Sequence, residues 1–283
     1  MAMTQPVRAS WVPQMVGQTH LMNALSLNSI AMNGSRLVGS ALIGVLIAMS
    51  GAGIAYVISV GLSGLLILTT LLIRPPQRQA VRLRHSMKAQ LLAGFRFMLQ
   101  DRLVLLLILI GLGPLAFAFS YMTLLPVIAT DVLGMGPEGF GALLSVGAVG
   151  ALIGGVILAS SGDMAHKGRV MVGAGLGYGV VLILLGGIPL ALLAFPIIAL
   201  AGACQTVFRT ANNTSLLLVT PPDLQGRVFS MTLLYTAMVP LASVLAGVIT
   251  DASNVPTAMV VIGSVCLAVV ACVALLEPRI RRL

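Results

Sequence analysis

Long apolar runs dominate this chain and restrict it to folds that a lipid bilayer can hold. Hydrophobic residues make up 58% of the 283 residues, charged residues only 8%, and mean hydropathy is +1.07. A helix of about 20 apolar residues crosses the ~30 Å hydrocarbon core. We therefore predict an all-α integral membrane protein with about eight transmembrane helices. The runs cover approximately residues 22–49, 54–73, 103–128, 139–161, 170–187, 189–218, 228–250 and 257–276.

The basic residues lie in alternate gaps between these runs. The intervening gaps, near 50–53, 129–138, 188–189 and 251–256, contain no Lys or Arg. By the positive-inside rule, both termini and the segment 74–102 are expected to be cytoplasmic, in a multi-pass protein of the inner or plasma membrane. The net charge of +9 then reflects topology, and we expect lipid rather than nucleic acid around the chain. The basic residues in this set of gaps are Arg8, Arg74, Arg78, Arg82, Arg84, Lys88, Arg96, Arg102, Lys167, Arg169, Arg227, Arg279, Arg281 and Arg282.

The segment 74–102 is a basic linker between unequal parts of the chain. It opens with Arg74-Pro75-Pro76, which ends the preceding helix. From Leu83 to Met98, apolar residues recur every three or four positions, which predicts an amphipathic helix at the lipid headgroups. A merely solvated linker is the alternative. Two spans precede the linker, within residues 1–73, and six follow it, within residues 103–283.

No residue cluster predicts catalysis or a bound metal. Cys204, Cys266 and Cys272 lie within apolar runs and lack CxxC spacing, so we interpret them as small buried hydrophobic residues. The three histidines are far apart in sequence. We expect no enzyme activity, no catalytic residues, no metal and no cofactor.

An offset of 203 positions aligns the first two spans with the last two. Residues 16–50 share seven identities with residues 219–253, and both windows hold a short loop followed by a span. Internal repeats of this kind are typical of transporters. By the same offset, counterparts of the third to sixth spans would precede residue 1. We therefore expect the chain to contain the last eight spans of a longer repeat.

Two stretches carry a resemblance to a known family. They run from Leu21 to Gly44, including Asn23-Ala24-Leu25-Ser26 and Arg36-Leu37-Val38-Gly39, and from Pro222 to Ser230, including Gln225-Gly226-Arg227. Both resemble the transmembrane-secretion-effector branch of the major facilitator superfamily, an enterobactin-exporter-like group of twelve-span carriers. The resemblance implies a partial major facilitator fold, spans five to twelve of twelve. Residues 1–73 would end the N-terminal bundle, and 103–283 would form the complete C-terminal six-helix bundle.

The resemblance also implies a function. It suggests a permease that exports a small organic molecule, drug-like or siderophore-like, by alternating access, with cation or proton coupling in the full-length form. A truncated, non-transporting membrane protein, a subunit of a permease complex, and the membrane subunit of an ATP-driven transporter remain alternatives. None of the seven Asp and Glu residues falls at mid-depth of a run, so a coupling carboxylate would lie outside these spans. The oligomeric state stays open.

Two arginines fall inside apolar runs, where a charge costs roughly 2.5–3.5 kcal/mol on insertion scales. We interpret these arginines, with the amide side chains near them, as candidates for lining a substrate cavity. Snorkelling of Arg209 and a structural pairing of Arg36 are the alternatives. The candidates are Arg36, Asn28, Asn33, Gln205, Arg209, Asn212 and Asn213.

Loop charges and small residues provide the remaining candidates. The loop Gly162-Asp163-Met164-Ala165-His166-Lys167-Gly168-Arg169 is similar to the family's signature loop, so the resemblance implies a gating role for Asp163, Lys167 and Arg169, and for Arg227 in the later loop. Small residues at four-residue spacing in the fourth span, and glycines five residues apart in the first span, predict close helix packing, and the resemblance implies that these two spans face each other. Generic close packing is the alternative. The packing candidates are Gly34, Gly39 and Gly44 in the first span, and Gly147, Ala151 and Gly155 in the fourth.

Overall fold

A computed structural model describes residues 95–161, 166–187, 191–221 and 224–282 of the chain. It also describes residues 27, 30–31, 34–35, 53–54, 57–58, 60–65 and 68. The first two predicted spans therefore lie largely outside the described residues, as do residues 74–94 of the predicted linker.

Six helical segments in the described part of the chain are long and apolar enough to cross a membrane. They coincide with six of the eight predicted runs, and the prediction of an all-α integral membrane protein is confirmed. Large apolar side chains remain exposed along them, such as Val248 at 59% and Leu275 at 71%, which suits a lipid environment. The segments are Arg102–Val132, Gly139–Ser160, Lys167–Gly187, Leu192–Val219, Gln225–Ala252 and Val255–Leu276.

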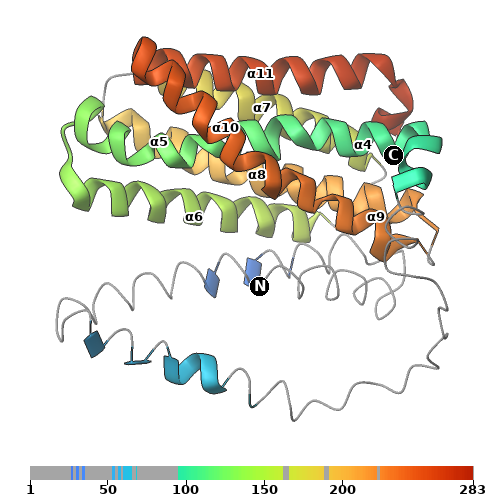
Figure 1. The fold of residues 1–283 in the computed structure, drawn as a ribbon, viewed down its shortest axis with the longest axis horizontal. Helices are drawn as coiled ribbons and strands as arrows, with labels where there is room; N and C mark the ends of the chain where they lie inside the picture. Colours follow the sequence, from blue (N-terminus) through green and yellow to red (C-terminus); the bar gives the residue numbers. More distant parts are fainter. Residues whose placement is uncertain are drawn as a thin grey trace.

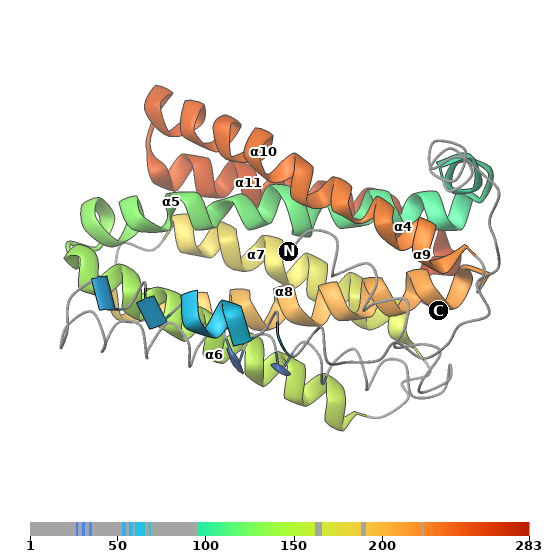
Figure 2. The same ribbon diagram turned by 60° about the horizontal axis from the view of Figure 1, so that its bottom comes forward.

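The segments alternate in direction along a single bundle (Figure 1). α8 packs between α6 and α7, and α7 packs in turn against α11. The first span packs against α8, α10 and α11, and α10 also packs against α11 (Figure 2). The elements of the first span are α4 (Arg102–Leu112), η1 (Gly113–Phe117), η2 (Ala118–Ser120), α5 (Tyr121–Val127) and η3 (Ile128–Val132). The others are α6 (Gly136–Ser160), α7 (Lys167–Gly187), α8 (Ala191–Val219), α9 (Gln225–Met231), α10 (Leu233–Ala252), α11 (Val255–Leu276) and η4 (Pro278–Arg282).

The first span is helical throughout but irregular. Asp101 starts it by accepting hydrogen bonds from the amides of Leu103 (2.9 Å) and Val104 (3.2 Å). Pro114 and Pro126 then each remove a backbone donor. Around these prolines the helix forms π-helical turns in η1 and η3 and a 3₁₀ turn in η2. Such turns are common where a proline interrupts a membrane helix.

Glycines bring the regular helices into backbone contact. A Cβ added at Gly179 of α7 would lie 2.9 Å from the carbonyl oxygen of Gly263, and one added at Gly263 of α11 would lie 2.7 Å from that of Gly179. A Cβ at Gly150 of α6 would overlap the carbonyl of Ala199 in α8. Lipid provides little hydrophobic force between membrane helices, so such close approach is a main source of their association.

Candidate substrate-binding face

Four polar residues of α8 lie on one face of the helix. Gln205, Arg209, Asn212 and Asn213 stand at positions i, i+4, i+7 and i+8, which a 3.6-residue period brings together. Arg209 precedes the end of α8 at Val219 by ten residues, or about 15 Å along the axis. Asn212 is fully buried, Gln205 and Asn213 are half-buried, and Arg209 is exposed.

Asn212 connects this face to α10 and the first span. Its Nδ2 donates to the Tyr235 hydroxyl at 3.5 Å, and that hydroxyl donates to the Leu107 carbonyl oxygen at 3.5 Å. Both distances are long for hydrogen bonds, so each contact is weak. Together they form a buried polar chain across three spans.

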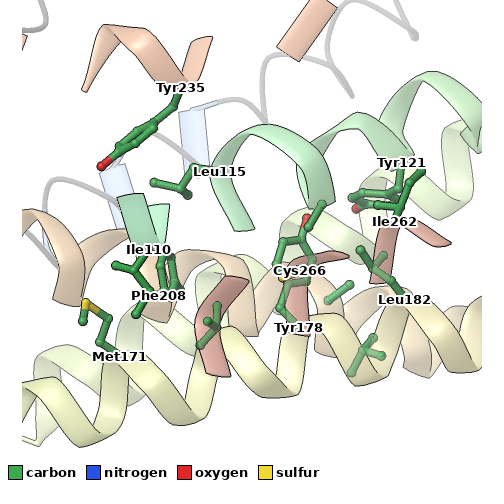
Figure 3. Close-up of a cluster of buried hydrophobic side chains, with 14 of the residues drawn as sticks. Ile110, Leu115, Tyr121, Met171, Tyr178, Leu182, Phe208, Tyr235, Ile262 and Cys266 are labelled. Carbon is green, nitrogen blue, oxygen red and sulfur yellow. The ribbon is translucent and has the colours of Figure 1, made fainter. Parts of the chain in front are cut away.

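The aromatic ring of Tyr235 is more firmly held than its hydroxyl. It lies against Gly111 of α4, where an added Cβ would come within 2.5 Å of the ring carbon Cζ. Figure 3 shows the ring directed from α10 toward the first span, beside the buried cluster that includes Leu115 and Ile110. Gly111 therefore makes the space that this tyrosine occupies.

Arg209 faces an aromatic side chain of the first span. Its Cζ lies 5.9 Å from the ring centroid of Phe119, in η2, which is within range of a cation–π interaction. The irregular part of the first span thus contributes Phe119 to the surroundings of the arginine. The guanidinium itself remains exposed, and a guanidinium is a donor that suits an anionic or hydrogen-bonding group.

Several buried polar atoms near this face have no hydrogen-bond partner in the described part of the chain. On α8 they are Gln205 Nε2, Asn212 Oδ1 and Ser215 Oγ. A second aromatic pair, Tyr121 with Tyr178, packs edge to face at 6.4 Å, and the Tyr178 hydroxyl is also unpaired (Figure 3). Unpaired polar groups are costly in an apolar medium. The α8 face can therefore offer hydrogen bonds to a ligand.

The acidic residues in the described part of the chain lie at helix ends, away from this face. Asp101 caps α4, Glu138 is in the first turn of α6, and Glu277 follows α11. Asp131 lies in the terminal turn η3, and Asp251 is next to last in α10. Within the described spans, no acidic side chain accompanies Arg209 at mid-depth.

The structure places the small residues of α6 on two different surfaces. Gly147 packs toward α8, with its added Cβ 3.3 Å from Ile198 Cγ2, and Ala151 is buried. Gly155 instead faces Ile30, whose Cγ1 lies 2.9 Å from an added Cβ, and Gly34 lies 3.7 Å from Leu152 on the same measure. Ile30 and Gly34 therefore lie against α6. The close contact with α8 also uses Gly150, Gly154 and Gly202, which were not among the predicted packing residues; a Cβ added at Gly202 would overlap the carbonyl of Gly147.

The loop cations lie at the helix termini. Lys167 begins α7 and is half-buried, Arg169 is exposed in its first turn, and Arg227 is half-buried in α9. Tyr235, Phe119 and Gly111, which surround the α8 face, were not among the residues predicted from the sequence. The remaining predicted residues lie outside the described part of the chain, namely Asn28, Asn33, Arg36, Gly39, Gly44 and Asp163.

Comparison with known proteins identifies the family. Residues 1–282 match the family described as transmembrane secretion effector. The chain is 30% identical over 223 residues to the enterobactin exporter EntS of Shigella boydii serotype 18, and 31% identical over the same length to that of Shigella dysenteriae serotype 1. Each alignment covers 76% of this chain and 51% of the relative, so the chain spans about half the length of the curated relatives it matches. The chain belongs to the transmembrane secretion effector family of the major facilitator superfamily.

Proposed function

We propose that this chain takes part in the efflux of a small, siderophore-like organic molecule across the membrane. The observation that carries the proposal is the polar face of α8, where an exposed arginine and three amide side chains lie inside an apolar span. Such groups are expensive in a bilayer and characteristically mark a substrate path. The relatives are named for enterobactin export, which supports a siderophore-like substrate.

Alternating access is the mechanism that we propose for this face. The polar chain from Asn212 through Tyr235 to Leu107 consists of two 3.5 Å contacts, which are weak enough to break when α8, α10 and the first span shift. The contact of Ile30 and Gly34 with α6 supports a sliding surface between the two parts of the carrier. In this proposal Lys167, Arg169 and Arg227, with Asp163, act at the gate.

The proposal includes a topology and a coupling ion. Both termini and the linker 74–102 are cytoplasmic, residues 1–73 belong to the N-terminal bundle, and residues 103–283 form the C-terminal bundle. Efflux is coupled to protons or another cation. Since no described carboxylate lies at mid-span, the coupling group is expected outside the described spans.

An export assay tests the proposal directly. The chain is expressed in a bacterium that makes a siderophore but lacks its exporter, alone and together with the first four spans of an enterobactin exporter. We expect siderophore secretion in at least the second case, and its loss with Arg209→Gln. Absence of secretion in both cases, with the protein verified in the membrane, contradicts the proposal and favours a non-transporting role.

A further inference from the structure

A second surface feature lies away from the α8 face, on the outer side of the α7–α11 pair. It is a groove of about 450 Å³ between the first half of α7 and the last turns of α11. Its walls are apolar along the helices, and two arginines stand at the end where α7 begins. The lining residues are Arg169, Val172, Gly173, Leu176, Ala271, Ala274, Leu275 and Arg281.

The fold brings the two arginines to the same groove. They are 112 positions apart in sequence, but η4 folds back over the start of α7. Gly168 makes this possible, because a Cβ there would overlap the carbonyl of Ile280. Ile280 is fully buried and anchors η4 on the bundle. Arg169 and Arg281, the neighbours of these two residues, are both exposed.

The charge of the groove differs from that of the adjacent cavity at the same end of the bundle. In the adjacent cavity, Glu277 pairs with Arg102 at 3.6 Å and with Arg279 at 3.7 Å. None of the residues that line the groove is acidic, so its two cations share an otherwise apolar lining. Two like charges brought together in this way favour an anion between them.

We propose that the groove binds an anionic phospholipid. The phosphate lies between Arg169 and Arg281, and an acyl chain follows Val172 and Leu176 into the bilayer. A basic pocket between membrane helices, placed at headgroup level and continued by apolar walls, has the chemistry that recognises such a lipid. Leu275, 71% exposed, borders the groove toward the acyl region.

The groove has open space for an acyl chain at Gly173. A Cβ added there meets no atom within 4 Å, although the residue lies within α7. A larger side chain at this position would therefore fill the groove without displacing the backbone. This binding does not depend on what the carrier transports.

Native mass spectrometry of the purified full chain in mild detergent tests the proposal. We expect phosphatidylglycerol to bind more tightly than phosphatidylcholine of the same acyl chains. Arg169→Gln and Arg281→Gln should each weaken phosphatidylglycerol binding about fivefold, and the double variant roughly twenty-five-fold. Gly173→Leu should weaken binding of the lipid with both arginines in place. Inorganic phosphate, titrated in the same buffer, should compete only weakly because it lacks the acyl chains.

Matched variants distinguish lipid binding in the groove from a general effect of positive charge on lipid binding. Arg279→Gln removes one exposed charge of η4 outside the groove, and Gly247→Leu adds a leucine at another open helical position. Both should leave phosphatidylglycerol binding unchanged. Equal losses with Arg279→Gln and Arg169→Gln would overturn the proposal. So would full competition by inorganic phosphate, or groove variants that alter the fraction of dimer while lipid binding stays the same.

Discussion

The α7–α11 pair and the α8–α10–first-span face belong to one bundle but differ in the regularity of their helices and in the contacts between them. In the α7–α11 pair, both helices are regular and Gly179 and Gly263 meet backbone to backbone. On the other face, the first span is interrupted by π and 3₁₀ turns, and Tyr235 contacts its neighbours through two long hydrogen bonds. Buried polar residues are concentrated on α8.

The α7–α11 pair is suited to hold its shape, and the α8–α10–first-span face is suited to change it. Backbone contacts through glycine tolerate no added atom and leave little freedom of movement. Weak polar contacts beside an irregular helix can be exchanged for contacts with a ligand at small cost. We therefore expect substitutions in the α7–α11 pair to affect folding, and substitutions on the α8 face to affect transport.

The largest effect is expected from Gly263→Leu in the α7–α11 pair. The leucine would push against the carbonyl of Gly179, so the helices would have to separate, at a cost at or above the ~1–3 kcal/mol typical of overpacking. The variant should aggregate or melt at much lower temperature in detergent, measured by size exclusion after heating. Gly247→Leu, at an open position of α10, is the control. If Gly263→Leu and Gly247→Leu had the same melting temperature, the α7–α11 pair would be no less tolerant of added atoms than α10, which would contradict the proposed difference between the two regions.

Arg209→Gln should lower transport while leaving the stability of the protein almost unchanged. Its side chain is exposed, so we expect a change in stability within about 0.5 kcal/mol. Loss of a charged hydrogen bond to substrate should lower export roughly tenfold to a hundredfold. Arg209→Lys, which keeps the charge but not the planar donor array, should retain an intermediate rate. Export unchanged in the glutamine variant would assign Arg209 to snorkelling.

The smallest effect is expected from Tyr235→Phe. The ring stays against Gly111, and only the two 3.5 Å contacts are lost, so we expect destabilisation of about 0.6 kcal/mol, the average for polar contacts between membrane helices. Thermal unfolding of this variant, of Asn212→Ala and of the double variant measures their coupling. If the stability changes of the two single variants add up to that of the double variant, the contacts of Asn212 and Tyr235 do not stabilise each other.

Much of the fold was predictable because hydrophobic length alone marks a membrane span. The run 103–128 was predicted as one helix, and Pro114 and Pro126 lie within it, but hydropathy does not report π turns. The packing residues of α6 were only partly predictable from spacing. Glycines occur on several faces of α6: spacing singled out Gly147, Ala151 and Gly155, but not Gly150 and Gly154, which also approach α8 closely.

The polar part of the candidate site was easier to predict than its aromatic part. Gln205, Arg209, Asn212 and Asn213 stand out against an apolar run, and their spacing places them on one helix face. Tyr235 and Phe119 do not stand out, since aromatic residues occur widely in membrane helices. Their roles depend on contacts between the first span, α8 and α10, which only the folded arrangement brings together.

The most direct test compares access from water at two exposed positions of similar depth. Arg209 lies ten residues before the end of α8 and Ala268 eight residues before the end of α11, about 15 Å and 12 Å from the same end of the bundle. Each is changed to cysteine in a chain without its three native cysteines, and a charged thiol reagent is added to membranes. We expect rapid modification at position 209 and none at position 268. A cysteine at 209 as unreactive as one at 268 would contradict a water-filled substrate path along α8.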